Sequence, residues 1–333
     1  MSDAVLKQIL KDYEKKKFNA ENIAENRKKL FLENNPELNK INSELNSLAF
    51  EMSKNILNNN SKKNNILSKE FNNLKIKKNN LLNSLNITEK YFLPEYECYV
   101  CKDTGYIQGT NNKTILCNCI KQKLFDIKYN SANIGDLGKE NFSTFDFSLY
   151  STEINTNKFK ANISPRKNIE NIKKIAEKFI NNFDNPEEKN LLFTGNTGLG
   201  KTFLSNCIAY ELLKKGNTVL YQSAGTMLDS IIDFKFGKEE NSENIYDNIL
   251  NVDLLIIDDL GTENINSLKF AELFNIINSR LLNQNHHITK TLISTNLSID
   301  NLFKTYDERI VSRLVGYYNI CRFFGDDIRF IKK

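Results

Sequence analysis

The sequence of 333 residues contains no run of about 18 apolar residues, the length that a helix needs to cross a membrane. Its opening residues, MSDAVLKQILKDYEKKK, are rich in lysine but have no apolar core followed by a cleavage site, so no export signal is recognised. Both absences lead us to expect a cytoplasmic protein. Histidine is scarce as well: His286 and His287 lie in a predicted loop, and we assign them no role.

Charge is unevenly distributed along the chain. The formal net charge is only +5, yet residues 1–90 contain 17 Lys and Arg against 11 Asp and Glu, which leaves the remainder close to neutral. A basic N-terminal part is typical of contact with nucleic acid or with an acidic protein face. A solvated helix surface explains the same excess, so charge alone does not choose between these interpretations.

Six cysteines are present, and in a cytoplasmic chain they indicate metal binding or burial rather than disulfides. Four of them form a C-x2-C pair and a C-x-C pair that 15 residues separate: Cys98, Cys101, Cys117 and Cys119. Four thiolates can close a tetrahedral zinc site, and an iron–sulfur cluster is the alternative. We predict a zinc-binding knuckle over residues 93–127, and we expect Cys207 and Cys321 to be small core residues.

The first 92 residues show helical periodicity. Apolar residues recur at steps of three and four in two runs on either side of NNNSKKNN: Ile41, Leu45, Leu48, Met52 and Ile56, then Leu67, Phe71, Leu74, Leu81 and Leu85. The pattern predicts an antiparallel helical hairpin within residues 1–92. It is either a self-contained coiled coil or a docking region for a partner protein, and we favour docking because two helices alone bury little surface.

Residues 128–163 are expected to form a linker, after which the sequence changes in character. Short apolar runs, NLLFTG, TVLYQSA, VDLLIID and KTLISTN, alternate with helical segments from residue 164 onward. Strands that alternate with helices predict βαβ units and an α/β fold whose parallel sheet is covered on both faces. We therefore expect one α/β domain over residues 164–333.

A phosphate site is predicted where the run NLLFTG meets GNTGLGKT and a helical run follows, because this is the strand–loop–helix setting of G-x-x-x-x-G-K-T. Its glycines let the backbone wrap phosphates and direct N–H groups inward. Lys201 would neutralise β- and γ-phosphate charge, and the Thr202 hydroxyl would bind Mg²⁺. The predicted ATP site comprises Gly195, Asn196, Thr197, Gly198, Leu199, Gly200, Lys201, Thr202 and Phe203.

Two further strand ends supply polar side chains to this site. Asp258 follows the buried run VDLLII, where α/β sheets place ligands, and we assign it to Mg²⁺. Asp259 is then placed to orient or deprotonate the attacking water. Asn296 ends TLISTN and would hold the water or sense the γ-phosphate, although such a residue alone would be an ordinary turn residue. These residues predict ATP hydrolysis, which we expect to be slow because glutamate, one methylene longer, is commoner in place of Asp259.

The order of these motifs, with ERIVSRL after them, resembles the AAA+ superfamily of P-loop NTPases. The resemblance implies that an arginine of one subunit reaches the γ-phosphate of its neighbour's ATP. By position Arg313 is that residue, and Arg309 assists it or pairs with Glu308 or Asp307; a surface salt-bridge helix is the alternative. Arg329 in FFGDDIRF matches a residue that contacts nucleotide within its own subunit. Few residues follow it, so we expect a domain lacking a full C-terminal lid.

The phrases DDLG, STNLS and ERIVSRL fit one clade within that superfamily. Over roughly residues 140–333 the chain is similar to DnaC/DnaI-type replicative helicase loaders, with the IstB-type ATPases as near relatives. The resemblance implies an ATP-dependent DNA replication factor whose N-terminal part binds a hexameric replicative helicase, which it delivers to single-stranded DNA. ATP binding and a slow, assembly-dependent hydrolysis would act as the switch. The alternatives are a transposition ATPase that binds duplex DNA and a zinc-dependent adaptor that senses ATP.

The same resemblance leaves two segments open to two interpretations each. The phenylalanines of NFSTFDF either pack under the linker or flank adenine. The segment SAGTMLDSIIDFKFG is either a core helix or a contact to single-stranded DNA, in which Tyr221, Lys235 and Phe236 would supply stacking and charge.

Overall fold

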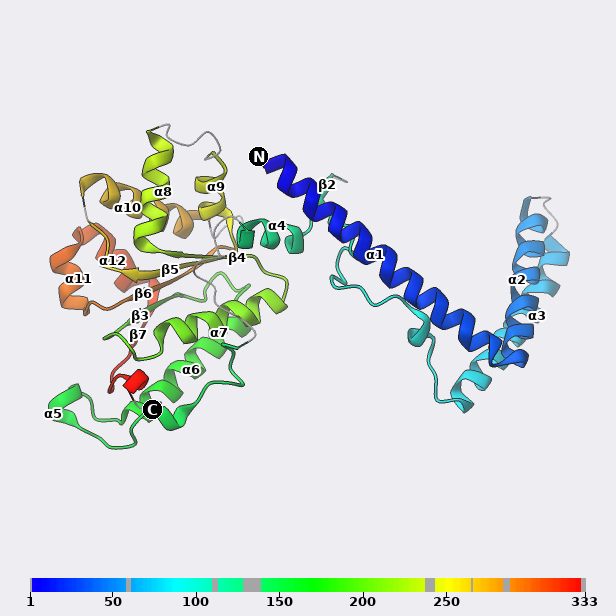
Figure 1. The fold of residues 1–333 in the computed structure, drawn as a ribbon, viewed down its shortest axis with the longest axis horizontal. Coiled ribbons are helices and arrows are strands. Elements are labelled where there is room, and N and C mark those ends of the chain that lie inside the picture. Colours follow the sequence, from blue (N-terminus) through cyan, green and yellow to red (C-terminus); the bar gives the residue numbers. More distant parts are fainter. Residues whose placement is uncertain are drawn as a thin grey trace. The chain divides into compact units, whose positions relative to one another are not determined.

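The computed structural model describes residues 2–57, 61–109, 113–127, 139–236, 243–264, 266–283 and 288–330. It contains two compact units, Lys7–Ile115 and Met1–Leu6 with Leu116–Lys333 (Figure 1). His286, His287 and residues 128–138 of the predicted linker lie outside the described residues. Within the described residues, no helix is long and apolar enough to cross a membrane.

The N-terminal unit is built from three helices, α1 (Ser2–Glu33), α2 (Pro36–Leu57) and α3 (Ser61–Ser84). Helices α2 and α3 pack against each other, and their apolar stripe is buried only in part. Ile41 and Leu45 are buried, whereas Ile56 of the same stripe is 63% exposed. Lys78, which interrupts the stripe of α3, donates a hydrogen bond of 3.5 Å to Asn42 Oδ1 on α2. The expected helical N-terminal region is confirmed.

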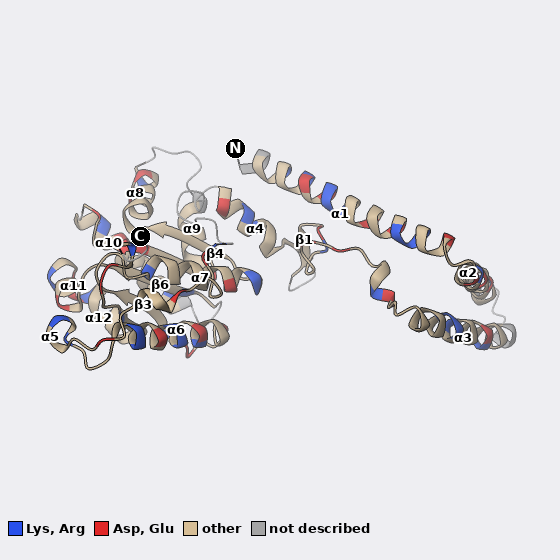
Figure 2. Cartoon of the chain, turned by 60° about the horizontal axis from the view of Figure 1, so that its bottom comes forward, with Lys and Arg blue, Asp and Glu red and all other residues tan. Residues whose placement is uncertain are grey.

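The rest of this unit packs along α1. The short helix η1 (Glu89–Phe92) places the Phe92 ring 5.1 Å from that of Phe31, and Arg27 donates to the Tyr91 carbonyl at 2.8 Å. Lys16 pairs with Glu97 at 2.5 Å. Basic and acidic residues are interspersed along α1 (Figure 2), so part of the N-terminal basic excess is balanced locally.

The larger unit contains a five-stranded parallel sheet in the order β4-β5-β6-β3-β7. Its strands are β3 (Asn190–Thr194), β4 (Val219–Ser223), β5 (Leu254–Leu260), β6 (Lys290–Thr295) and β7 (Tyr318–Arg322). Strand β3 therefore has β6 on one side and β7 on the other. The carboxyl ends of β3, β5 and β6 meet at one edge of the sheet, where an α/β fold binds its ligands.

Helices cover both faces of the sheet, as Figure 1 shows. Side chains alternate along β5: Leu254 and Ile256 join one core with α6 and α7, while Leu255 and Ile257 join the other with α8, α10 and α12. The longer helices are α6 (Pro165–Asn181), α7 (Lys201–Lys214), α8 (Ala224–Lys235), α9 (Glu243–Asn251), α10 (Ser267–Asn283) and α12 (Glu308–Tyr317). The short ones are α4 (Asn118–Phe125), η4 (Phe147–Leu149), α5 (Thr156–Phe159), α11 (Ile299–Thr305) and η5 (Ile328–Phe330). The predicted α/β fold is confirmed.

A buried arginine ties the layers of this unit together. Arg280 of α10 is 1% exposed, and its guanidinium donates to the carbonyls of Ile249, Val252 and Lys290 at 2.6–3.0 Å. Burial lowers the pKa of Arg280 to about 9. Backbone oxygens rather than a carboxylate satisfy this cation, so it joins α10 to the loop before β5 and to the start of β6.

Candidate functional site

The loop between β3 and α7 has a backbone that only glycine fits at two positions. Gly195 has φ 139°, and a Cβ there would lie 2.2 Å from the carbonyl oxygen of Phe323. Gly198 has φ 73°, and its Cβ would lie 2.0 Å from the Asp327 carboxylate. The loop then enters α7 at Lys201, so its amides gather at a helix N-terminus, which favours phosphate.

Lys201 joins this loop to the neighbouring strand β6. Its ammonium group donates to the carbonyls of Gly195 at 2.6 Å and Asn196 at 2.8 Å, and to Asn296 Oδ1 at 2.8 Å. Burial lowers the pKa of Lys201, and Asp259 and Asp258 oppose that effect. The structure thus brings Lys201 and Asn296 together, as the sequence predicts.

The Asp258 carboxylate accepts hydrogen bonds from three side chains. Thr202 Oγ1 donates to its Oδ2 at 3.2 Å, Tyr221 donates to the same oxygen at 2.6 Å, and Ser294 donates to its Oδ1. Thr202 and Asp258 offer hard oxygen atoms side by side, a donor set that suits Mg²⁺. Burial, followed by the Asp258 carboxylate, raises the pKa of Tyr221, which therefore remains a proton donor.

Asp259 is exposed beside this carboxylate. Its φ is 53°, in the left-handed region, at an irregularity in the pairing of β5 with β6 between Ile257 and Leu260. Burial and the Asp258 charge raise the pKa of Asp259, while Lys201 and a hydrogen bond with Asn296 lower it. The local twist of the strand directs successive acids into different surroundings, since Asp258 is buried and Asp259 is not.

The remaining residues of the phosphate loop differ in exposure. Asn196 and Thr197 are exposed, whereas Leu199 is buried and its carbonyl accepts a hydrogen bond of 3.1 Å from the Tyr150 hydroxyl. Phe203 packs edge-on against Phe145, with ring centroids 5.5 Å apart. Phe145 belongs to the core around α6 and α7, which favours packing over adenine contact for the phenylalanines of NFSTFDF.

Arg329 lies on a C-terminal segment that returns to the phosphate loop. The Ile328 amide donates to the Gly198 carbonyl at 2.9 Å, and the Arg329 guanidinium pairs with Asp327 at 2.5 Å. That ion pair lowers the pKa of Asp327 and raises the pKa of Arg329. The segment places a second cation near Lys201.

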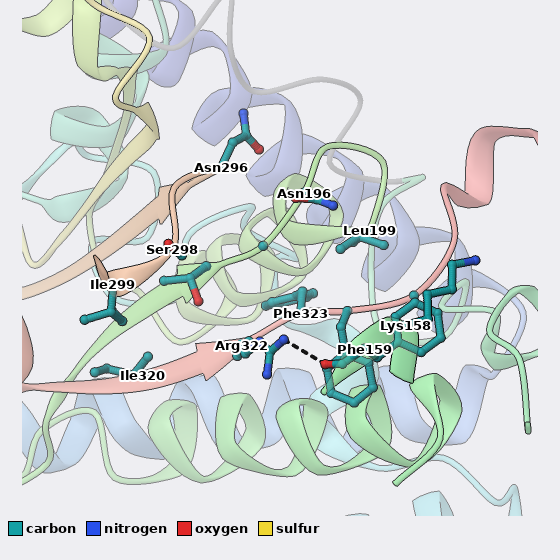
Figure 3. Close-up of a pocket in the computed structure, with 14 residues that line it drawn as sticks. Lys158, Phe159, Asn196, Leu199, Asn296, Ser298, Ile299, Ile320, Arg322 and Phe323 are labelled. Atoms are coloured by element: carbon teal, nitrogen blue, oxygen red, sulfur yellow. Dashed lines mark hydrogen bonds between the residues drawn. The ribbon is translucent and has the colours of Figure 1, made fainter. Parts of the chain in front are cut away.

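A cavity of about 370 Å³ opens beside the phosphate loop (Figure 3). The carboxyl ends of β3, β6 and β7 contribute to its walls, with Asn196 and Asn296 among the lining residues. Arg322 lines it as well and donates to the Phe159 carbonyl at 2.8 Å. Gly195, Asn196 and Leu199 of the phosphate loop therefore border an open space at the ligand-binding edge of the sheet, whereas Lys201, Thr202 and Asp258 are not among its lining residues.

Arg309 and Arg313 lie on a different surface of the same unit, where α12 packs against α10. Arg313 donates to Asn278 Oδ1 at 2.9 Å, and its guanidinium lies 4.5 Å from the centre of the Phe274 ring. Arg309 lies 5.3 Å from the same ring and pairs with Asp307 at 2.9 Å. Among the described residues no carboxylate pairs with Arg313. The structure does not bring these arginines to the chain's own phosphate loop.

The suggested DNA contact by Tyr221 is wrong. Tyr221 is 2% exposed within the sheet, where it donates to Asp258, so it cannot stack on a base. Helix α8 buries Met227, Leu228 and Ile231, as a core helix does. Phe236 is 65% exposed at its end.

The four cysteines Cys98, Cys101, Cys117 and Cys119 come together, with all sulfur atoms within 4.8 Å of one another. In a tetrahedral zinc site with bonds of about 2.3 Å, sulfur atoms lie about 3.8 Å apart. Asp103, which sequence reasoning missed, is buried and accepts hydrogen bonds from the amides of Cys98 at 2.8 Å and Glu97 at 3.0 Å. The hairpin of β1 (Tyr106–Gln108) and β2 (Thr114–Leu116) links the two cysteine pairs.

Comparison with known proteins gives a family match that lies within the larger unit. A sequence profile of IstB-like ATP binding proteins matches residues 153–326, just over half of the chain. The replicative helicase loader DnaC of Escherichia coli strain K12 is 27% identical over 139 residues, which are 42% of this chain and 55% of DnaC. The chain thus spans about half the length of these loaders.

Further similarities lie among initiators and solved structures. The chromosomal replication initiator protein DnaA of Buchnera aphidicola (subsp. Baizongia pistaciae, strain Bp) is 33% identical over 150 residues, 43% of this chain and 31% of that protein. The crystal structure of DnaI has 22% identity and a TM-score of 0.43, covering 58% of this chain and 93% of that chain. The DnaC helicase loader structure has 22% identity and a TM-score of 0.41, covering 53% and 99%.

Proposed function

Because the chain belongs to the family of IstB-like ATP binding proteins, we propose that it is an AAA+ ATPase that loads a replicative helicase onto DNA. The resemblance to DnaC-type loaders drawn from the sequence agrees with the 27% identity to DnaC. The observation that carries the ATPase assignment is the polar network at the strand ends, where Lys201 contacts Asn296 and Thr202 contacts Asp258. These contacts unite three separate strand ends into one site.

In the proposed reaction Lys201 and the loop amides bind the phosphates, and Arg329 contacts the nucleotide from the C-terminal segment. Thr202 and Asp258 would hold Mg²⁺, which supplies charge neutralisation at the phosphates. Asn296 positions the attacking water, and Asp259 accepts its proton. The exposed position of Asp259 and its contact with Asn296 support that assignment.

Arg313 is proposed to complete the site of a second copy of the chain. Among the described residues its partners are neutral, the Asn278 amide oxygen, the Arg309 carbonyl and the Phe274 ring, so its charge remains available to a phosphate. Arg309 is pinned by Asp307 and acts as a supporting residue. This arrangement makes hydrolysis dependent on self-association, because Arg313 would stabilise the charge of the transition state only at a subunit interface.

The four cysteines are proposed to hold one structural zinc ion. The donor set, four sulfur atoms within 4.8 Å, supports a closed site, and the Asp103 contacts to the Cys98 and Glu97 amides support a preformed turn. Metal analysis of the purified full-length protein should give one zinc per chain, with Cys98→Ser and Cys117→Ser lowering that content. Iron with a visible charge-transfer band would instead assign an iron–sulfur cluster.

The helicase is proposed to dock on the N-terminal helices. Large apolar side chains remain uncovered on them, among which Phe50 is 75% and Ile66 is 69% exposed. The delivered substrate would be single-stranded DNA, and the role of the ATP cycle would be to switch between holding and releasing the helicase. The similarity to the replicative helicase loader DnaC favours this proposal over a transposition ATPase.

Native mass spectrometry tests the loader assignment directly. The full-length protein is mixed with the replicative helicase of its host, with and without ATP, and the complexes are weighed. We expect a defined complex that Phe50→Asp with Ile66→Asp abolishes and that Phe236→Asp, a matched change on the ATPase unit, leaves intact. Free helicase in every condition would overturn the loader assignment, and binding to duplex DNA would then favour the transposition ATPase. Asp259→Asn that leaves the biological activity unchanged would favour the ATP-sensing adaptor.

A further inference from the structure

Three neighbouring strands place polar side chains on one face of the sheet. Strand β5 lies between β4 and β6, with Tyr221 opposite Ile256 and Ile257 opposite Ile293. Side chains two residues apart share a face, so Asp258 lies on the face of Ile256, and Ser294 lies on that of Leu292. This is the face that α7 covers, and α7 begins with Lys201 and Thr202.

The contacts on that face converge on Asp258. Its Oδ2 accepts from Tyr221 at 2.6 Å and from Thr202 at 3.2 Å, and its Oδ1 accepts from Ser294. Each carboxylate oxygen has two lone-pair sites, so Oδ2 is saturated and Oδ1 retains one acceptor site. The Thr202 hydroxyl donates its hydrogen bond to Asp258, so the lone pairs of the Thr202 oxygen can bind a cation.

We propose that Tyr221 and Ser294 are positioning residues that hold the Asp258 carboxylate in the orientation that binds Mg²⁺, an inference that rests on the proposed ATPase function. Their donors fix both oxygens from opposite sides, one from β4 and one from β6. The free acceptor site of Oδ1 and the Thr202 hydroxyl then face the cation or its water shell together. Neither positioning residue contacts the metal or the nucleotide.

Because Tyr221 is buried, its hydroxyl can be removed without changing the exposed surface of the protein. Tyr221 is 2% exposed, and its ring packs in the core between the sheet and α7. Phenylalanine would keep that packing and remove the hydroxyl, with its hydrogen bond to Asp258 and its contact with the Thr202 side chain. Outer-shell partners of metal ligands typically contribute about 10- to 100-fold in metal affinity. The hydroxyl should therefore affect magnesium binding more than it affects folding.

The test first measures the affinity of the full-length protein for a fluorescent ATP analogue in EDTA. Mg²⁺ is then titrated into protein saturated with that analogue. We expect Tyr221→Phe to raise the Mg²⁺ concentration at half-saturation about tenfold or more, with the affinity in EDTA unchanged within twofold. Tyr318→Phe is the matched control, a buried tyrosine of the same sheet at the start of β7, and it should leave the midpoint unchanged. A loss of packing by itself would not shift the Mg²⁺ concentration at half-saturation.

An unchanged Mg²⁺ midpoint in folded Tyr221→Phe would overturn the positioning role. If Tyr221→Phe fails to fold, the same titration is carried out on Ser294→Ala, which removes the donor to the other carboxylate oxygen. The same shift of the Mg²⁺ midpoint is expected, and its absence would overturn the positioning role. Failure of the ATPase assignment looks different, because the wild-type protein itself would then bind no nucleotide or show no response to Mg²⁺. The two failures are therefore distinguishable.

Discussion

Lys201 donates three hydrogen bonds to oxygen atoms of its own unit and lies near the Asp258 and Asp259 carboxylates, whereas the Arg313 guanidinium has only neutral partners among the described residues. At the strand ends, groups of the same unit fix the Lys201 ammonium and the Asp258 carboxylate, so these two charges are ordered before a ligand arrives. On the α10–α12 surface, an aromatic ring and an amide orient Arg313 but leave its charge uncompensated. One chain therefore builds the phosphate site at the strand ends by itself, whereas Arg313 needs an anion from another molecule.

Replacement of Arg313 should have the largest effect, since a trans-acting arginine contributes about 1,000-fold or more to phosphoryl transfer. Arg313→Ala should lower the rate of ATP hydrolysis of concentrated protein by that factor and leave its nucleotide affinity unchanged. Steady-state phosphate release, measured over a range of protein concentrations, provides the check. Lys304→Ala on the neighbouring α11 serves as a surface control.

Mixing two inactive variants sharpens the same prediction. Arg313→Ala supplies an intact phosphate loop, and Lys201→Ala supplies an intact arginine, so their mixture should recover activity that neither has alone. A mixture that stays inactive would place Arg313 outside a neighbour's site. Loss of nucleotide affinity in Arg313→Ala would contradict the separation of the two regions.

Asp259→Asn should lower hydrolysis by about 100-fold, the scale of a lost general base. A base must be ionised, and burial together with Asp258 raises the pKa of Asp259. Activity should therefore fall as the pH drops through that raised pKa, at a less acidic pH than an ordinary aspartate would give. Asp259→Asn should remove this acidic limb from the pH–rate profile, with Asp300→Asn as a surface control. An unchanged limb would assign it to another group.

Lys201→Ala should weaken ATP binding by about 10- to 100-fold, because one charge-assisted contact to phosphate contributes about 1.5–3 kcal/mol. Titration of a fluorescent ATP analogue measures the loss, and Lys173→Ala on the surface of α6 is the control. Thermal unfolding without nucleotide should change little, because removing the lysine also removes the cost of burying its charge. Equal loss of binding in Lys173→Ala would point to a general electrostatic effect.

The sequence contained enough to predict the strand ends but not what surrounds them. GNTGLGKT, VDLLIIDD and TLISTN are local signals, since a buried apolar run followed by a polar residue marks the edge of a parallel sheet. Tyr221 and Ser294 needed the order of the strands, which brings β4, β5 and β6 side by side. Without that order, Tyr221 resembled a residue available for stacking on DNA. The contact of the Phe274 ring with the two guanidinium groups likewise depends on the packing of α10 against α12, which no motif encodes.

Phe274→Leu is the smallest and most selective test of the comparison. The ring lies under both guanidinium groups, and a partly exposed cation–π contact contributes about 0.5–1 kcal/mol. Leucine preserves an apolar contact and removes the ring face, so hydrolysis should fall about two- to fivefold while nucleotide affinity and Mg²⁺ dependence stay constant. Phe236→Leu controls for loss of an aromatic side chain elsewhere on the unit. A fall in nucleotide affinity would mean that the α10–α12 surface communicates with the chain's own phosphate loop, and the two regions would then be one site rather than two.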